Sequence, residues 1–340
     1  MTQSPCGDRL AGITHALTGR AHLLPGGPYD VGREKIREFA NAVQAKHPAH
    51  YREQAAAALG HDKLIAPITF TAILSAVAQQ HIFGDLLPGY DVTQVLHTEQ
   101  YILSHRPIRS GDRLNCLISL RSFRRSHGQD KFVFSTDVID CGERLVQTIR
   151  TAAVARSDGI VDEKLVRAAK RLIRQDAPGA RAPMVEVTGL PLPAMPFTPR
   201  PTLEFDDVSV GDDIGAASVR LSRGDLVNFA GVSGDVNPIH WNSRVAVLAG
   251  LDNVVAHGLL TMSLSAGYIA SWAGDPGAVR EHGVRFISPV FVDANDGGDV
   301  KLTGSVRALD PITKVASIAL DATSRGRKLF GRATATVQLG

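Results

Sequence analysis

An acidic and a basic side chain stand five residues apart in the segment 231–241, Gly-Val-Ser-Gly-Asp-Val-Asn-Pro-Ile-His-Trp. The glycine, asparagine and proline residues predict a curled loop, in which Asp235 and His240 can face one point. A carboxylate and an imidazole at one point form a minimal general acid–base pair. Spacing alone leaves another interpretation open, in which Asp235 caps a helix or turn and His240 is a surface histidine.

A glycine at the predicted start of a helix is the second candidate group. Gly258 follows Ala256 and His257 and opens a long apolar run. The N-terminus of a helix presents unpaired N–H groups and a partial positive charge, and glycine lets a ligand approach the backbone closely. This pattern predicts an oxyanion site for a carbonyl. The alternative is that Gly258 only permits close packing of the helix start.

A faint internal repeat organises the elements that must position these groups. At an offset of 190 residues, the chain matches itself without a gap from Phe39 to Ala76; Phe39 lies on Phe229 and His50 on His240. A period of this length indicates a duplicated domain rather than a solenoid.

Each copy predicts the same order of elements: a short amphipathic helix, a polar loop, a longer apolar helix, and then strands with alternating polarity. The predicted helices are 33–43 and 68–83 in the first copy, and 223–232 and 258–273 in the second. The predicted strands are 95–104, 113–121, 131–139 and 145–154, then 300–308, 315–323 and 328–338. A helix that is apolar nearly all round must be wrapped by other elements. The pattern therefore predicts an α+β fold in which an antiparallel sheet wraps the longer helix.

A linker is predicted between the copies. It divides the chain into an N-terminal domain at 1–159, a linker at 160–200 and a C-terminal domain at 201–340. Residues 161–175 are basic and helix-prone, and the favoured interpretation is a solvated connecting helix rather than a docking helix. Residues 176–201 are rich in proline and are expected to be extended.

The two chemical motifs together resemble a known family. Gly234 to His240 match the pattern Gly-Asp-x-Asn-Pro-x-His of the MaoC-like, or hydratase-2, hot-dog proteins, and Ala256-His257-Gly258 matches their helix entry. Residues 203–340 resemble the catalytic B subunit of the (3R)-hydroxyacyl-acyl-carrier-protein dehydratase of mycolic-acid elongation, and residues 28–156 resemble, less specifically, its non-catalytic A subunit. The resemblance implies a double hot-dog, with two antiparallel sheets each wrapped round a long central helix.

The resemblance also implies the reversible dehydration of a (3R)-3-hydroxyacyl thioester to a trans-2-enoyl thioester in fatty-acid or mycolic-acid elongation. His240 would take the C2 proton, and Asp235, protonated or through a water, would deliver a proton to the departing hydroxyl. The Gly258 N–H would stabilise the carbonyl oxygen. Asn237 would hold the loop, and Ser233 would support it or serve the turn alone. Two alternatives remain: an (R)-specific enoyl-CoA hydratase of fatty-acid breakdown, and a non-catalytic protein that binds acyl thioesters.

The first copy keeps only one of the proposed reacting groups, His50. Ala45 stands in place of the carboxylate, His47 in place of the asparagine, and Ile68 in place of the glycine. We therefore expect this copy to be non-catalytic, with His50 as a remnant or a structural residue. The family implies that it helps to shape a tunnel for the acyl chain.

Composition limits the class of protein. The 340 residues are 44% hydrophobic and 21% charged, which is typical of a soluble globular protein, and the net charge of +3 is too small to indicate nucleic-acid binding. No apolar run reaches the ~18 residues of a membrane span, and the N-terminus does not look like a secretory signal. The three cysteines have no metal-ligand spacing, and their odd number favours a reducing cytoplasm.

The expected partners follow from the predicted reaction. It needs neither a metal nor a redox cofactor, and its substrate would be carried on the phosphopantetheine of acyl carrier protein or of coenzyme A. Carrier proteins are acidic, so Arg121, Arg124 and Arg125 are candidate docking residues, unless they only form a solvated strand end. The fused chain is expected to be self-sufficient as a pseudo-heterodimer, with further pairing left open.

Overall fold

The computed structural model describes residues 17–87, 90, 95–156, 162–173, 183–188, 193–194, 197 and 202–340. Cys6 and most of the proline-rich part of the predicted linker lie outside these residues. Below, the first half means residues 17–156 and the second half means residues 202–340, each without its gaps.

The first half begins with two short strands and three short helices, which are followed by its central helical segment (η2, α4 and η3) and four long strands. In chain order these are β1 (Ala21–Leu23), β2 (Tyr29–Asp30), α2 (Arg33–Ala42), η1 (Pro48–His50), α3 (Glu53–Ala58), η2 (Ile68–Thr71), α4 (Ala72–His81), η3 (Ile82–Leu86), β3 (Leu96–Ser104), β4 (Arg113–Ser126), β5 (Gln129–Asp140) and β6 (Leu145–Arg156).

Two elements lie between the halves, α5 (Glu163–Leu172) and β7 (Val185–Val187). The second half repeats the plan of the first. Its elements are η5 (Phe205–Asp207), β8 (Asp213–Leu221), α6 (Arg223–Ser233), η6 (Pro238–His240), α7 (Ser243–Leu248), α8 (Gly258–Ala273), η7 (Pro276–Ala278), β9 (Val279–Phe286), β10 (Gly298–Asp310), β11 (Val315–Ser324), β12 (Arg327–Lys328) and β13 (Phe330–Gln338).

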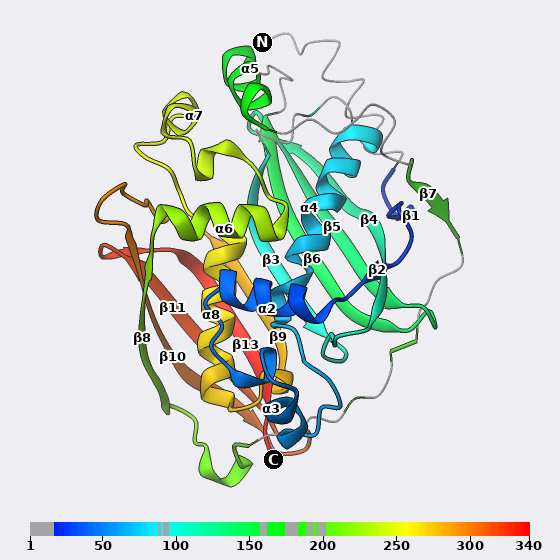
Figure 1. Ribbon diagram of the computed structural model, residues 1–340, viewed down its shortest axis with the longest axis vertical. Helices are drawn as coiled ribbons and strands as arrows, with labels where there is room; N and C mark the ends of the chain where they lie inside the picture. The colour runs from blue at the N-terminus through cyan, green and yellow to red at the C-terminus, as the bar shows by residue number, and fades with distance from the viewer. Residues whose placement is uncertain are drawn as a thin grey trace.

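The strands form one sheet in the order β7-β1-β4-β5-β6-β3-β9-β13-β11-β10-β8, with β2 added to β4 and β12 to β11. Order β4-β5-β6-β3 in the first half corresponds to β10-β11-β13-β9 in the second, which confirms the duplication. The halves meet where β3 pairs antiparallel with β9, with Tyr101 opposite Gly283 (Figure 1). The predicted α+β double hot-dog is therefore confirmed, and its two sheets are joined edge to edge.

The central helices differ between the halves. Helix α8 is continuous over the predicted range and buries Leu260, Met262, Leu264 and Ile269. In the first half, the helix predicted over 68–83 starts as the 3-10 turn η2, is α-helical only in α4, and ends as the π-helix η3. Both central helices lie against the sheet in Figure 1. The second half therefore has the more regular support for a site at the start of its helix.

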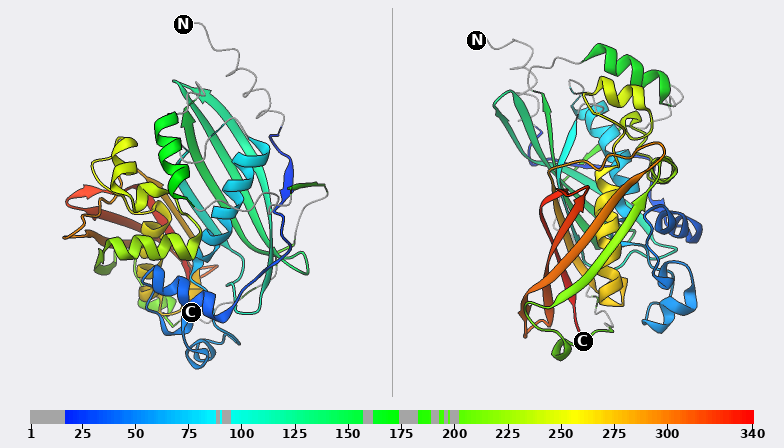
Figure 2. Two further views of the ribbon diagram at one scale, coloured as in Figure 1. Left: turned by 45° about the horizontal axis from the view of Figure 1, so that its top comes forward. Right: turned by 90° about the vertical axis from the view of Figure 1, so that its left-hand side faces the viewer.

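Helix α5 docks on the second half. Asp162 caps it by accepting from the N–H groups of Lys164 and Leu165. Its buried Leu165, Val166 and Ala169 form one side, and the helix packs against α7 (Figure 2). The favoured interpretation of a solvated connecting helix is therefore wrong, because the apolar side of α5 is covered. Among the described residues, no helix has the length and apolarity that crossing a membrane requires.

Candidate active site

The end of α6 fixes the position of Asp235. Gly234 caps this helix with a φ of 81°, a left-handed conformation that glycine adopts without strain. The Ser233 hydroxyl donates to the Phe229 carbonyl at 2.7 Å and accepts from the Asp235 N–H at 3.2 Å. The carboxylate therefore comes directly after a rigid helix end, where the chain turns back.

The next residues curl the loop. The Asn237 N–H donates to Oδ1 of Asp235 at 3.4 Å, and Oδ1 of Asn237 accepts from the Ile239 N–H at 3.3 Å. Pro238 then opens η6, the single turn that contains His240. Ser233 and Asn237 both make hydrogen bonds within this loop, the role expected for Asn237 and one of the two roles left open for Ser233.

His240 is buried and held in one tautomer. Its Nδ1 lies 2.8 Å from the Val255 carbonyl oxygen, which can only accept, so Nδ1 carries the proton of a neutral ring. The Nε2 atom then has a free lone pair. This leaves His240 ready to accept a proton at Nε2.

His257 adds an imidazole to the same place. Its ring stacks on that of His240, with ring centres 3.7 Å apart, and its Nε2–H donates to the Asp235 carbonyl at 3.1 Å. One polar atom from each of Asp235, His240 and His257 lies within 4.8 Å of the other two. His257 belongs to the helix-entry motif, but no role was predicted for it; its position directly before Gly258 was the available signal.

Gly258 is the first residue of α8, so its N–H belongs to the first turn, where no intrahelical partner exists. A Cβ at this position would lie 3.4 Å from the Phe286 ring, so the glycine and the aromatic ring fit closely. The structure thus brings Asp235, His240 and the start of α8 together, as the sequence predicted, because His257 contacts all three.

Burial and neighbouring charges set the protonation states. Burial lowers the pKa of His240 below its ordinary 6.5, against the opposing effects of Asp235 and the Val255 carbonyl. Burial raises the pKa of Asp235, but His257, His240, His97 and the Asn237 N–H together lower it by more, so that it lies below its ordinary 3.8. Burial lowers the pKa of His257 to about 3. At neutral pH the pair is therefore a carboxylate and a neutral imidazole.

Proximity alone would allow Asp235, His240 and His257 to hold a metal ion. A ring nitrogen binds a metal along its lone pair, which lies in the plane of the ring. The rings of His240 and His257 are stacked, with planes only 26° apart. Stacked rings cannot both direct lone pairs in their planes at one ion, so the group fits a metal poorly.

The corresponding loop of the first half has kept its shape. Nδ1 of His50 lies 2.8 Å from the Ile65 carbonyl oxygen, the same contact 190 residues earlier, and Nδ1 of His47 accepts from the Ala49 N–H as Asn237 accepts from Ile239. Burial lowers the pKa of His50 to about 4. Since no carboxylate stands at Ala45, the first half keeps the support of the site without its acid–base pair.

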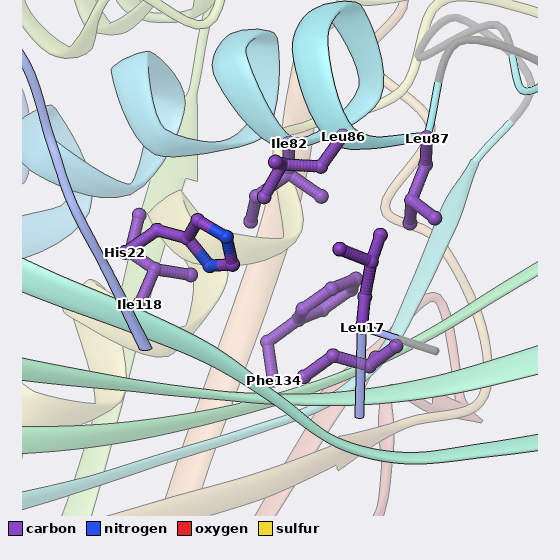
Figure 3. Close-up of a pocket in the computed structure, with 8 residues that line it drawn as sticks. Leu17, His22, Ile82, Leu86, Leu87, Ile118 and Phe134 are labelled. Carbon is purple, nitrogen blue, oxygen red and sulfur yellow. The ribbon is translucent and has the colours of Figure 1, made fainter. Parts of the chain in front are cut away.

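An apolar pocket lies elsewhere in the first half, between η3 and the sheet (Figure 3). It is lined by Leu17, His22, Ile82, Leu86, Leu87, Ile118, Leu120 and Phe134. The family-based expectation of an acyl-chain tunnel in this half stays a prediction. Of the three arginines predicted for docking, Arg125 binds the Asp130 carboxylate with two hydrogen bonds, of 2.7 and 2.8 Å, and so holds the β4–β5 hairpin.

Comparison with known proteins decides the family. Residues 16–149 match a FAS1-like dehydratase domain region, and residues 207–321 match a MaoC-like domain. A solved structure described as a MaoC-like dehydratase is 39% identical, with a TM-score of 0.89 over 96% of this chain and 100% of that one. The chain belongs to the MaoC-like dehydratase family.

Two further proteins extend the comparison. A UPF0336 protein of Streptomyces coelicolor is 38% identical over 145 residues, which are 43% of this chain and 96% of that relative. A Mycobacterium tuberculosis protein described as having a double hotdog fold superposes with a TM-score of 0.64 over 96% of this chain and 98% of its own, at 13% identity. This last likeness shows the fold alone and agrees with the joined pair of half-sheets.

Proposed function

We propose that this member of the family is a (3R)-3-hydroxyacyl-thioester dehydratase that works reversibly, forming trans-2-enoyl thioesters in fatty-acid or mycolic-acid elongation. The observation that carries the proposal is one cluster: the Asp235 carboxylate and the free Nε2 of His240 beside the start of α8. The family, described as dehydratases, supports the reaction type.

The difficult step is removal of a weakly acidic proton from C2. The Gly258 N–H would donate to the thioester oxygen as negative charge develops there, and the partial positive charge at the start of α8 would add to this effect. The free Nε2 of His240 would accept the C2 proton. The close ring of His257 keeps the imidazole in place while this happens.

The hydroxyl at C3 must leave as water, so it needs a proton. Because the pKa of Asp235 is lowered, its resting form is the carboxylate, which favours delivery through a water over a protonated Asp235. The proton that His240 takes from C2 can return to the departing hydroxyl through that water, which the Asp235 carboxylate holds in place, so that no net proton is consumed. The pair titrates jointly, and in hydration the same groups would orient and deprotonate the attacking water.

The acyl group would be carried on the phosphopantetheine of acyl carrier protein, in the cytoplasm, without a metal or redox cofactor. Coenzyme A carries the same phosphopantetheine arm. Turnover of carrier-protein and coenzyme A thioesters of equal chain length would therefore separate elongation from the breakdown pathway.

The test uses hydration of a crotonyl thioester. Asp235→Asn and His240→Ala should each lower kcat/KM by about 100-fold or more, the usual scale for general acid–base groups. His50→Ala is the matched control, because its imidazole makes the same backbone contact in the first half. Equal losses at all three positions would mean that the site is misplaced, and binding without any turnover by the unmodified protein would indicate a non-catalytic acyl-thioester binder.

A further inference from the structure

The pairing of β3 with β9, called the seam below, brings residues of the first half close to the active site. His97 is the second residue of β3, and β3 is the strand that pairs with β9 of the second half. Leu96 is exposed, and the His97 side chain is half-buried. The described residues offer its ring no hydrogen-bond partner within the protein. A half-buried imidazole at this edge is therefore free to bind something else.

The pseudo-symmetry of the fold shows which part of the second half lies next to His97. The bridges Ile65–Arg109 and Val255–Phe291 occupy equivalent places, and 109 and 291 are 182 apart, as are Tyr101 and Gly283 at the seam. The same spacing makes Val279 the counterpart of His97.

Val279 lines a pocket of the first half. This pocket is lined in part by Ala66 and Ile68, and Val279 reaches it from the second half. Ala66 and Ile68 are the counterparts of Ala256 and Gly258, where α8 begins. By the same crossing of the seam, His97 lies beside the start of α8, next to the acid–base pair.

Electrostatic coupling agrees with this placement. Burial lowers the pKa of His97, while Asp235 raises it and His240 lowers it further. His97 is in turn one of the groups that lower the pKa of Asp235. These effects require His97 to be near both members of the acid–base pair.

We propose that His97 is a further catalytic residue, supplied by the otherwise non-catalytic half, which donates a hydrogen bond to the C3 hydroxyl or to the attacking water beside Asp235. This inference rests on the proposed function. The proposed mechanism places the thioester oxygen at the Gly258 N–H. His97 lies next to Asp235 and His240 instead, so its imidazole is placed to contact the oxygen at C3. A neutral imidazole can donate to that oxygen while the Asp235 carboxylate accepts from it.

Among the described residues, few charged or titratable groups lie near His97. Asp235 and His240 face it from the loop after α6, and His257 lies behind them at the start of α8. Its neighbour on β6 is the uncharged Ala153. On β9, Arg285 lies 3.6 Å from Glu99 and is paired with it. The coupling that matters for pH is therefore between His97 and Asp235.

The experiment compares His97→Ala, His97→Gln and the control His105→Ala. His105 is also a half-buried histidine of the first half, directly after β3, and its Nε2 contacts Thr148 instead of the site. His97→Ala should lower kcat for crotonyl-thioester hydration by about 10-fold to 100-fold, the range for loss of a hydrogen bond to a charged group, because the oxygen at C3 carries negative charge in the transition state. His97→Gln should recover most of kcat, because its amide can donate from a similar place.

The pH profile gives a second readout. The acid limb of kcat/KM follows His240, and His97 is not among the groups that shift the pKa of His240; it acts on Asp235, which is already ionised there. The loss in His97→Ala should therefore be the same factor along the whole acid limb, whereas a disturbed acid–base loop would move the limb. The inference is overturned if His97→Ala behaves like His105→Ala, or if glutamine restores nothing.

Complete inactivity of the unmodified protein on every thioester would instead be a failure of the proposed function. In that event, His97 is judged by calorimetric binding of a 3-hydroxybutyryl thioester. We expect affinity to be weakened by His97→Ala and largely restored by His97→Gln; unchanged affinity would overturn the inference.

Discussion

At the scale of single residues, the site depends on keeping an imidazole neutral beside an ionised carboxylate. Burial favours the neutral form of His240, and the Val255 carbonyl fixes the proton on Nδ1. Asp235 has the opposite preference, because three imidazoles and a backbone N–H offset the effect of burial. Both groups are thus in their basic forms at neutral pH, which suits proton removal in either direction.

This arrangement predicts the acid side of the pH profile. His240 must be neutral to accept a proton, and its pKa lies below the ordinary 6.5. We therefore expect kcat/KM for enoyl-thioester hydration to fall to half of its plateau only below pH 6.5. Steady-state rates from pH 4.5 to 8, with stability checked at each pH, test this; a half-maximal point at or above pH 6.5 would contradict it.

Sequence was most informative about residues of one local segment. Ser233, Asp235, Asn237 and His240 lie within eight positions, so turn chemistry alone indicated that they converge. The side chains that complete the wall, His97 and Phe286, come from strands that meet only through the pairing of β3 and β9. No spacing along the chain reports such a contact, and neither residue was predicted.

At the scale of elements, the start of α8 can be tested separately from the acid–base pair. In Gly258→Ala, the new Cβ would lie 3.4 Å from the Phe286 ring, which is an ordinary contact, so the fold should accept it. Alanine also favours a helix over glycine by up to about 1 kcal/mol. The free energy of unfolding should therefore not decrease.

Activity of Gly258→Ala should behave differently. The methyl group occupies space that the thioester needs to reach the backbone N–H, so kcat/KM for hydration should fall by about 10-fold or more, within the range for loss of one oxyanion donor. Urea unfolding and turnover of the same preparation measure both effects. Full activity would show that the carbonyl binds elsewhere.

Elements with a clear hydrophobic period were predictable, and the others were not. Strand β11 alternates between buried and partly exposed residues, and it was predicted to within one residue. Strands β8 and β9 were missed: β8 contains two consecutive alanines and a glycine, and β9 carries three charged residues and Gly283. β9 is held by neighbours on both sides, so its order comes from pairing rather than from its own pattern.

At the scale of the whole molecule, both halves bury histidines in the neutral form. Burial lowers the pKa of His50 in the first half and of His282 in the second to about 4. A histidine whose folded pKa is below its unfolded value takes up protons first in the unfolded state. Stability is therefore complete above about pH 6.5 and is lost as the pH falls towards 4.

This predicts the response of His50→Asn, whose amide can still donate to the Ile65 carbonyl. At pH 5, about 1.5 units below the ordinary pKa, His50 should cost the unmodified protein about 2 kcal/mol that the variant does not lose. Urea unfolding at pH 7 and pH 5 measures the difference. A gap between the two proteins that stays constant would show that His50 is charged in the folded state.

The duplication could be predicted from the sequence, whereas the pairing of β3 with β9 could not. The repeat at 190 residues predicted two like units, and His50 and His240 do make equivalent contacts. Nothing in the repeat indicates which edges meet, because an edge strand has no distinct periodicity. The sequence likewise did not indicate that α5 docks on α7, since amphipathicity does not reveal which partner covers the apolar side.

The pairing of β3 with β9 has a consequence for the relative amounts of the two halves and for how they assemble. In an assembly of separate chains, such a junction forms by encounter and is lost on dilution. Here both strands belong to one polypeptide, so the local concentration of one for the other is set by the tether rather than by the amount of protein made. Each polypeptide therefore contains one copy of each half, so the two halves are always made in equal amounts. Neither half can accumulate without the other and expose an unpaired sheet edge.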